Sequence, residues 1–232
     1  MIGENKMKTG IAYFCSALAL VMSGGALAQD NVRGDSGFYG GLAIGKAKAK
    51  LDTGDFTFNQ AGVKERKDEL DTAYKFFGGY QFSRYIAAEL SYTDLGKFAY
   101  IYDASGIGLG EERLNYKAKS WATSAVGSIP MGSSGFSLLG RLGITYNFAE
   151  RSGFTGDGLT VAATFPRPPA SKHRFSPLWG VGVGYDFSPA LGLRLEYEDY
   201  GKFGESVNAS SNFVETGRAK IHMYSLNFVA RF

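Results

Sequence analysis

The chain has 232 residues and a formal net charge of +3, because 25 Lys and Arg residues are offset by 22 Asp and Glu residues. This near balance gives no reason to expect nucleic acid as a partner. Glycine (32 residues), Phe (18) and Tyr (14) are abundant, and this composition is typical of β structure in which backbones approach closely.

The first 28 residues have the three parts of a secretory signal peptide. Lys6 and Lys8 precede an apolar run at 11–22, and the small residues Ala26 and Ala28 form a cleavage site. The run has about a dozen residues, whereas a membrane-spanning helix needs roughly 20. We therefore expect a signal peptide over 1–28 that is cleaved after Ala28.

Cleavage leaves a single domain of residues 29–232 with a net charge of +2. This domain is the same whether translation starts at Met1 or at Met7. The only cysteine, Cys15, lies in the removed segment. Disulfides, a thiol nucleophile and cysteine metal sites are therefore excluded from the exported protein.

Alternation of side-chain type is the main pattern in the rest of the chain, and it is clearest at 136–148. One face of this segment carries Phe136, Leu138, Gly140, Leu142, Ile144, Tyr146 and Phe148. Its length exceeds that of most strands in soluble proteins and matches a tilted strand that spans a membrane. The same period recurs at 177–187, where inward glycines suit a narrow, crowded lumen.

An uncharged segment at 121–140 has to be considered as a transmembrane helix. Its middle, 129–135, reads Ile-Pro-Met-Gly-Ser-Ser-Gly. That sequence would break a helix but suits a tight turn between two strands. We therefore interpret the segment as a hairpin and expect no transmembrane helix in the exported protein.

These patterns together predict an all-β fold, an eight-stranded antiparallel up-and-down transmembrane β-barrel. We place the strands at 37–48, 71–82, 85–96, 116–129, 135–148, 174–187, 190–201 and 220–232. Short links near 83–84, 130–134 and 188–189 alternate with long polar connections near 49–70, 97–115, 149–173 and 202–219. Bacterial barrels keep short turns in the periplasm and long loops outside, so we expect both termini in the periplasm.

Aromatic residues fall into two groups, one at each end of the predicted strands. Tyr80, Phe82, Phe136, Tyr185, Phe187, Phe228 and Phe232 lie near the short turns, and Tyr74, Tyr92, Tyr146, Phe148, Tyr197 and Tyr224 lie near the long loops. Such belts are typical of the two membrane interfaces, and the core of a soluble sandwich would not need them.

One hairpin design occurs twice in the chain. The segment GYQFSRYIAAELSYTDLGKF at 79–98 matches GYDFSPALGLRLEYEDYGKF at 184–203. Each copy has aromatics beside a short turn, then an alternating strand, then Gly-Lys-Phe before a long loop. Two copies are too few for a solenoid, and a closed barrel built from hairpins explains them better.

Several segments resemble the OmpA-like transmembrane domain. They are FYGGLAIG at 38–45, FFGGYQF at 76–82, AELSYTDLG at 88–96, GRLGITY at 140–146 and LRLEYEDYG at 193–201. The resemblance covers nearly all of the predicted exported domain. It implies an integral protein of the outer membrane of a Gram-negative bacterium, surrounded by outer-membrane lipids and lipopolysaccharide.

The end of the chain also carries a recognisable pattern. Tyr224, Leu226, Phe228, Ala230 and Phe232 share one face of the last predicted strand. This pattern looks like the C-terminal signal that the outer-membrane barrel-insertion machinery recognises. We therefore expect that machinery as a partner during assembly.

The inward face of the predicted strands collects charges. Glu89, Arg141, Arg194 and Glu196 have this parity, flanked by Lys75, Gln81 and Asn147. Eight strands enclose a space that side chains can fill, and buried charges need partners because desolvation is costly. We expect an ion-pair network that plugs the lumen, with a gated narrow channel for small solutes as the alternative. The OmpA-like resemblance implies that an acid and an arginine pair at Glu89 and Arg194.

A lipid A-modifying enzyme is the third hypothesis, because some eight-stranded barrels modify lipids. Such an enzyme needs a nucleophile, a base and an orienting acid in contact. His173 lies in a predicted loop, and His222 shares the lipid face with Tyr224 while Ser225 points into the lumen. We therefore expect no catalytic residues, no cofactor and no metal site. The function we expect is an envelope structural role, or contact with a host or surface ligand through four external loops.

Overall fold

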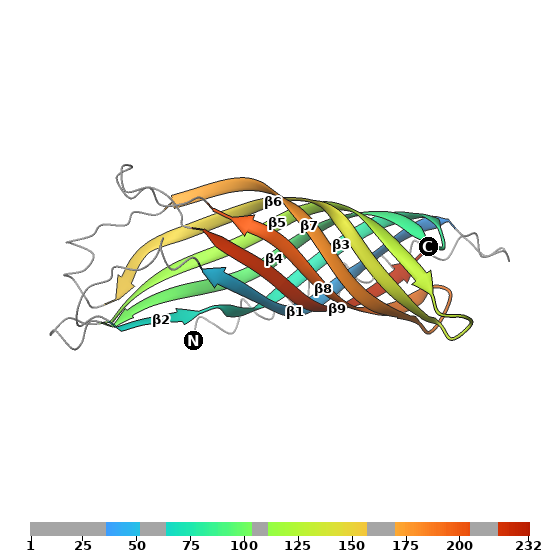
Figure 1. Ribbon diagram of the computed structural model, residues 1–232, viewed down its shortest axis with the longest axis horizontal. Helices are drawn as coiled ribbons and strands as arrows, with labels where there is room; N and C mark the ends of the chain where they lie inside the picture. The colour runs from blue at the N-terminus through green and yellow to red at the C-terminus, as the bar shows by residue number, and fades with distance from the viewer. Residues whose placement is uncertain (1–35, 52–63, 104–110, 157–169, 205–217) are drawn as a thin grey trace, which may run out of the picture. The chain divides into compact units, whose positions relative to one another are not determined.

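The computed structural model describes residues 36–51, 64–103, 111–156, 170–204 and 218–232. They form nine strand segments, drawn in Figure 1: β1 (Gly37–Leu51), β2 (Lys64–Asp68), β3 (Leu70–Ser83), β4 (Ile86–Asp103), β5 (Glu111–Pro130), β6 (Phe136–Gly156), β7 (Ala170–Asp186), β8 (Leu191–Phe203) and β9 (Ala219–Arg231). The predicted signal peptide and its cleavage site at Ala26 and Ala28 lie outside the described residues.

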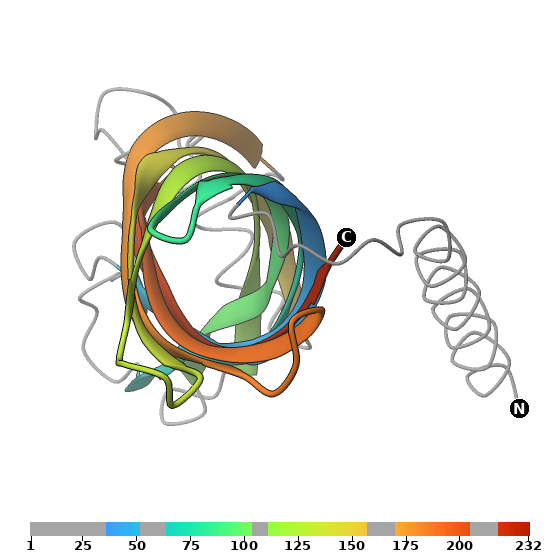
Figure 2. The ribbon, with the colours of Figure 1, turned by 90° about the vertical axis from the view of Figure 1, so that its right-hand side faces the viewer.

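The strands close into one antiparallel barrel, seen end-on in Figure 2. From β3 to β9 each strand pairs with the next strand in the chain, and β1 pairs with both β3 and β9, which closes the ring. β2 and β3 both pair with β4 and are separated only by Glu69, so they occupy one position in the wall. The predicted eight-stranded up-and-down barrel is therefore confirmed.

Tight turns join the strands at one end of the barrel. Between β5 and β6, Gly132 and Gly135 adopt φ angles of 64° and 80°, which favour glycine because other residues are strained there. The Ser134 hydroxyl donates a hydrogen bond to the Met131 carbonyl at 2.7 Å. The short links are thus where the sequence predicted them.

At the other end the strands run further than predicted. β4 continues to Asp103, β5 begins at Glu111, β6 continues to Gly156 and β7 begins at Ala170. The prediction of loops over 97–115 and 149–173 was therefore wrong in these parts, and His173 lies on a strand. The strands continue because the barrel remains filled there, by side chains such as Phe98 and Leu114, each 1% exposed.

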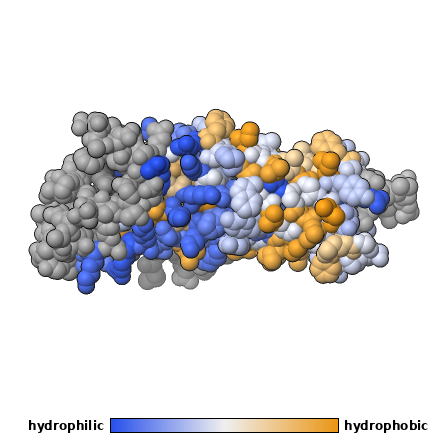
Figure 3. All heavy atoms as spheres, viewed as in Figure 1, coloured by the Kyte–Doolittle hydropathy of each residue, from blue (hydrophilic) through white to orange (hydrophobic). Residues whose placement is uncertain are grey.

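The outward face of the barrel has an apolar zone bounded by aromatic side chains. Ring contacts near the short turns include Phe38 with Tyr80 at 4.9 Å and Phe136 with Tyr185 at 4.7 Å. Ring contacts toward the loops include Tyr92 with Trp121 and Tyr197 with Tyr224, both at 5.0 Å. Figure 3 shows the apolar zone toward the short turns and a hydrophilic surface toward the loops. Among the described residues, no helix has the length and hydropathy to cross a membrane.

One stretch of the wall is held by side chains instead of a backbone ladder. The pairing of β7 with β8 ends at Trp179 and Asp199, next to Pro177, which has no N–H to donate. Beyond that point the Ser176 hydroxyl donates to the Lys202 carbonyl at 2.8 Å. The Asn147 amide donates to the Tyr200 carbonyl at 2.9 Å. These bonds keep the wall continuous where the ladder stops.

Candidate functional site: the lumen of the barrel

Six charged side chains meet inside the barrel. They are Lys75 on β3, Glu89 on β4, Arg141 on β6, and Arg194, Glu196 and Glu198 on β8, and all are buried. Strand alternation explains their meeting, because every second residue of each strand points inward. We call these six residues the charged layer.

Arg141 is the hub of the charged layer. Its Nη1 atom donates to Glu89 Oε1 at 2.6 Å and to Ser124 Oγ at 2.9 Å. Its Nη2 atom donates to Glu196 Oε2 at 3.2 Å, and its Nε atom lies 3.2 Å from Glu198 Oε1. One guanidinium thus faces three carboxylates, a geometry for which its fork of donors is well suited.

Lys75 and Arg194 complete the pairing. Lys75 Nζ donates to Glu198 Oε2 at 2.7 Å and to Glu196 Oε2 at 3.1 Å. Arg194 Nη1 donates to Glu89 Oε2 at 3.4 Å, and its guanidinium lies 5.1 Å from the ring of Tyr39. The Tyr39 hydroxyl donates to the same Glu89 oxygen at 3.0 Å.

The charged layer is balanced, with three cations and three carboxylates, so each charge within the layer has an opposite partner. Balance matters because an unpaired buried charge is costly. Glu198 Oε1 accepts no aligned hydrogen bond from a described group. A cavity of about 10 Å³ beside Glu198 and Arg141 has room for about one water.

The four residues predicted for the lumen, Glu89, Arg141, Arg194 and Glu196, lie together in this layer. Glu89 makes its shorter contact with Arg141, at 2.6 Å, and its longer contact with Arg194, at 3.4 Å. Lys75, expected only at the flank, is a direct member.

Sequence reasoning missed two participants, Glu198 and Tyr39. Glu198 was detectable, because it shares parity with Arg194 and Glu196. Asn147, one of the expected flanking residues, is not a member of the charged layer. Its side-chain oxygen accepts a hydrogen bond from the Ser120 hydroxyl at 2.7 Å.

A second, apolar layer fills the barrel between the charged layer and the loops. Its larger members are Leu51, Leu95, Phe98, Tyr100, Leu114, Tyr116, Phe203, Ile221 and Met223, each at most 3% exposed. The Tyr200 hydroxyl lies at the junction of the two layers, 3.0 Å from Thr93 Oγ1 and 3.4 Å from Glu198 Oε2. Any path along the lumen meets both layers in series.

The two histidines of the predicted exported domain lie on the outer surface. His173 contacts the rings of Tyr146 and Phe148, at centroid distances of 5.7 and 4.9 Å. His222 lies against Tyr197 at 5.6 Å and is opposite Asp199 across the β8–β9 ladder. Within the described ranges, no three histidine, cysteine or carboxylate side chains gather to hold a metal ion.

The residues of the predicted assembly signal lie on or just after β9. Tyr224, Leu226 and Phe228 point outward beside Lys46, Ile44 and Leu42 of β1. Ala230 is half-buried, and Phe232 is exposed after the end of the strand. Their role in assembly stays a prediction.

No curated protein sequence matches the chain. Among solved structures, it is similar to Ail of Yersinia pestis (18% identity, 84% of this chain and 99% of that one, TM-score 0.43). It is also similar to OprG of Pseudomonas aeruginosa (18% identity, 87% of this chain and 99% of that one, TM-score 0.49). A further similar structure is that of the outer membrane protein AlkL (16% identity, 88% of this chain and 94% of that one, TM-score 0.50). The likeness to AlkL supports the barrel fold. The family model of the OmpA-like transmembrane domain matches residues 33–232, and the chain therefore belongs to this family of outer-membrane β-barrels.

Proposed function

We propose that this protein is a closed barrel of the outer membrane, which supports the envelope and presents its loops at the cell surface without conducting solutes or catalysing a reaction. The observation that carries the proposal is the pair of lumen layers in series. The charged layer lies at the level of the outward apolar zone, and the apolar layer lies beyond it. A solute would have to break ion pairs and also displace packed aromatic side chains.

The orientation that we propose follows from the ends of the barrel. The links between β3 and β4, β5 and β6, and β7 and β8 are short, and β1 starts and β9 ends on the same side. In bacterial barrels the short turns face the periplasm. The connections that contain residues 52–63, 104–110, 157–169 and 205–217 would then face the outside.

Conductance in planar bilayers tests the closed lumen. We expect no steady conductance from the wild type. The double variant Glu89→Ala/Arg141→Ala removes one acid and one base and so keeps the charged layer balanced. Phe98→Ala/Tyr100→Ala opens the apolar layer. Because the layers are in series, each double variant should stay near baseline, and only their combination should conduct.

Heat-dependent migration in gels would first establish that every variant folds. Steady conductance by the wild type would contradict the closed barrel. A small conductance would favour the narrow-channel hypothesis, and a conductance on the scale of a general porin would indicate a wider pore. Full opening by one double variant would show that the other layer does not seal the lumen.

A deletion strain tests the envelope role. We expect greater sensitivity to detergent, or weaker adhesion to host cells, than in the parent strain. A matched variant with shortened loops and an intact barrel separates the two roles, because it should restore detergent resistance but not adhesion. Unchanged detergent sensitivity and adhesion in the deletion strain would contradict both roles.

A further inference from the structure

The repeated hairpin ends in the same local structure in both copies. Asp94 Oδ1 accepts a hydrogen bond from the Gly96 N–H at 3.0 Å, and Asp199 Oδ1 accepts one from the Gly201 N–H at 2.8 Å. Both glycines have positive φ, 89° and 71°. The strand pairing shifts at both places, so each is a β-bulge.

Each bulge changes which residues face outward. After the inward Leu95, simple alternation would turn Lys97 inward and Phe98 outward. The extra residue reverses this, so Lys97 is exposed and Phe98 is buried. Lys202 and Phe203 are arranged in the same way in the second copy. The bulge thus places a lysine on the outer wall and an aromatic ring in the apolar layer.

A groove of about 380 Å³ lies on the outer wall beside the first bulge. It is lined by Asp71, Thr72, Tyr74, Asp94, Gly96, Lys97, Lys117 and Lys119. Lys97 is opposite Lys117, and Asp94 is opposite Lys119, across the β4–β5 ladder. The volume falls within the range of small-ligand sites. We call it the lysine groove.

The two carboxylates of the lysine groove are engaged by backbone groups. Asp71 accepts hydrogen bonds from the N–H groups of Thr72 at 2.7 Å and Lys97 at 2.6 Å. Asp94 accepts its bond from Gly96. Among the described residues, the ammonium groups of Lys97, Lys117 and Lys119 form no ion pair. The groove therefore offers three ammonium groups to an anion, and its lining keeps a net positive charge when the two carboxylates are counted.

The position of the groove indicates which anion it meets. On β3, β4 and β5, an outward aromatic residue lies two positions nearer the middle of the barrel than a residue that lines the groove. The pairs are Tyr74 with Thr72, Tyr92 with Asp94, and Trp121 with Lys119. Two residues of a strand span roughly 6.6 Å. Outward aromatics of this kind mark the membrane interface. The lysine groove thus lies at the level of lipid headgroups, on the loop side.

We propose that the lysine groove binds the phosphate groups of lipopolysaccharide in the outer leaflet. Basic pockets at membrane interfaces bind anionic headgroups in this way. Lys46 extends the site, because its ammonium donates to the Thr72 hydroxyl at 3.0 Å on the rim of the groove. The inference rests on the proposed outer-membrane location and orientation but not on the closed lumen, so a conductance result leaves it intact.

A second basic surface near the other bulge supplies the matched control. It carries Lys48, Lys50 and Lys202 on the outer wall. There Asp199 forms an ion pair with Lys220 at 2.9 Å. The variant Lys48→Gln/Lys50→Gln/Lys202→Gln removes the same charge from the barrel as Lys97→Gln/Lys117→Gln/Lys119→Gln but leaves the lysine groove unchanged.

Binding is measured with the full protein in zwitterionic micelles, using Trp121 fluorescence in a Trp179→Phe background. The probes are bisphosphorylated lipid A, dephosphorylated lipid A and inorganic phosphate. The groove variant should weaken binding of bisphosphorylated lipid A roughly 100-fold, since each lysine near a membrane phosphate contributes about a fivefold factor. The control variant should change it less than fivefold. Lys→Arg at the three groove positions keeps the charge and should keep the affinity.

Equal affinity for the two lipid A forms, or equal losses in the groove and control variants, would overturn the proposal. Equally tight binding of inorganic phosphate would also overturn it, in favour of a site for free anions. If the triple groove variant does not fold, Lys117→Gln alone serves, because its side chain is exposed. It should weaken binding about fivefold, and an unchanged affinity would contradict the groove.

Discussion

The two halves of the barrel follow opposite rules for where charge is placed. In the half near the short turns, the outward side chains are apolar, such as Leu142 and Leu195, and the lumen holds the charged layer. In the half near the loops, the outward side chains include Lys48 and Lys50, and the lumen holds the apolar layer. The first half is built for a lipid exterior and the second for water. The aromatic belt on the loop side marks the level at which the polar and apolar faces of the wall are exchanged.

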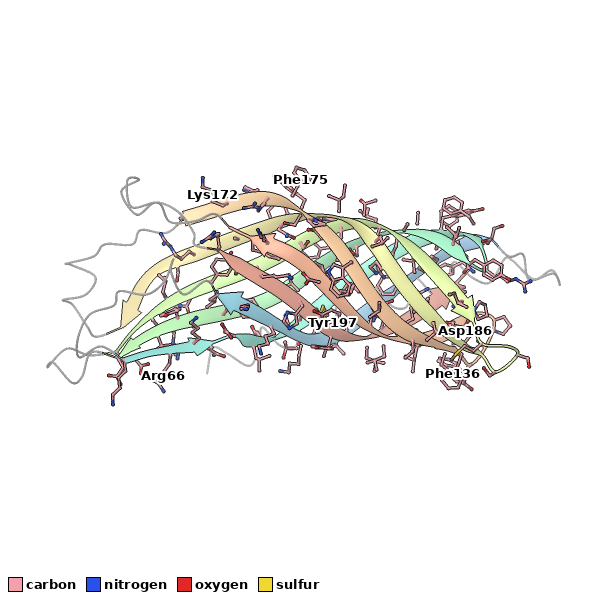
Figure 4. All side chains as sticks on the ribbon, viewed as in Figure 1. Arg66, Phe136, Lys172, Phe175, Asp186 and Tyr197 are labelled. Carbon is pink, nitrogen blue, oxygen red and sulfur yellow. The ribbon has the colours of Figure 1, made fainter. Side chains whose placement is uncertain are left out.

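Figure 4 places labelled residues along this axis. Phe136 and Asp186 lie toward the short turns, Tyr197 lies near the middle, and Arg66 and Lys172 lie toward the loops. The exchange explains how one chain can pass through both surroundings without interrupting its strands. Each strand continues through this level, although the backbone ladder between β7 and β8 stops there, and the identity of alternate side chains changes.

The largest effect should come from breaking the charged layer. Glu89→Ala removes the shortest carboxylate contact of both Arg141 and Arg194 and leaves the charged layer with three cations and two carboxylates. It should therefore lower the free energy of unfolding by about 3–5 kcal/mol. Urea unfolding in micelles, followed by tryptophan fluorescence, measures it. Adding Arg141→Met to Glu89→Ala should recover part of the loss. A loss below about 1 kcal/mol would mean that water reaches these charges.

A smaller loss should follow a cavity in the apolar layer. Phe98→Ala should lower the free energy of unfolding by about 3 kcal/mol, the lower end of the range for buried Phe, because the layer is near the loops. Phe98→Leu fills most of the space and should cost less than about 1.5 kcal/mol. The same unfolding assay applies, and equal costs for Ala and Leu would show that the layer is loosely packed.

The smallest effect should come from an exposed ion pair in the outer half. Arg66 Nη2 lies 2.6 Å from Glu111 Oε2, the same distance as Arg141 from Glu89, but its side chain is 63% exposed. Exposed pairs contribute only about 0–1 kcal/mol. Arg66→Ala should therefore change the free energy of unfolding by less than about 1 kcal/mol. A loss of unfolding free energy as large as that caused by Glu89→Ala would show that exposed and buried ion pairs contribute equally in this barrel.

Sequence alone predicts the strand number, the short turns and four members of the charged layer, because all three depend on period-two alternation. It did not predict the full length of the strands. The segment 46–51 reads Lys-Ala-Lys-Ala-Lys-Leu and still alternates, with apolar residues now inward. The expectation that outward residues are apolar therefore ends the strand at Lys48. The alternation itself continues to Leu51 with its polarity reversed.

The individual ion pairs could not be predicted from the sequence. Lys75 contacts Glu196 across 121 positions in the chain. Their meeting depends on the register of every strand pair between them, and a shift by one residue would reverse the faces. The alternation of side chains therefore determines which residues point into the lumen, whereas the register of the strand pairs determines which of them are in contact.

The exchange of polarity at the aromatic belt is tested most directly by lipid contact along β1. Fluorophores attached to single cysteines, Ile44→Cys and Lys48→Cys, are exposed to quenching by brominated lipids. Both side chains point outward, about 13 Å apart along the strand. Strong quenching at position 44 and weak quenching at position 48 are the expected results. Equal, strong quenching at both positions would place the lysine surface in the hydrocarbon and contradict the account.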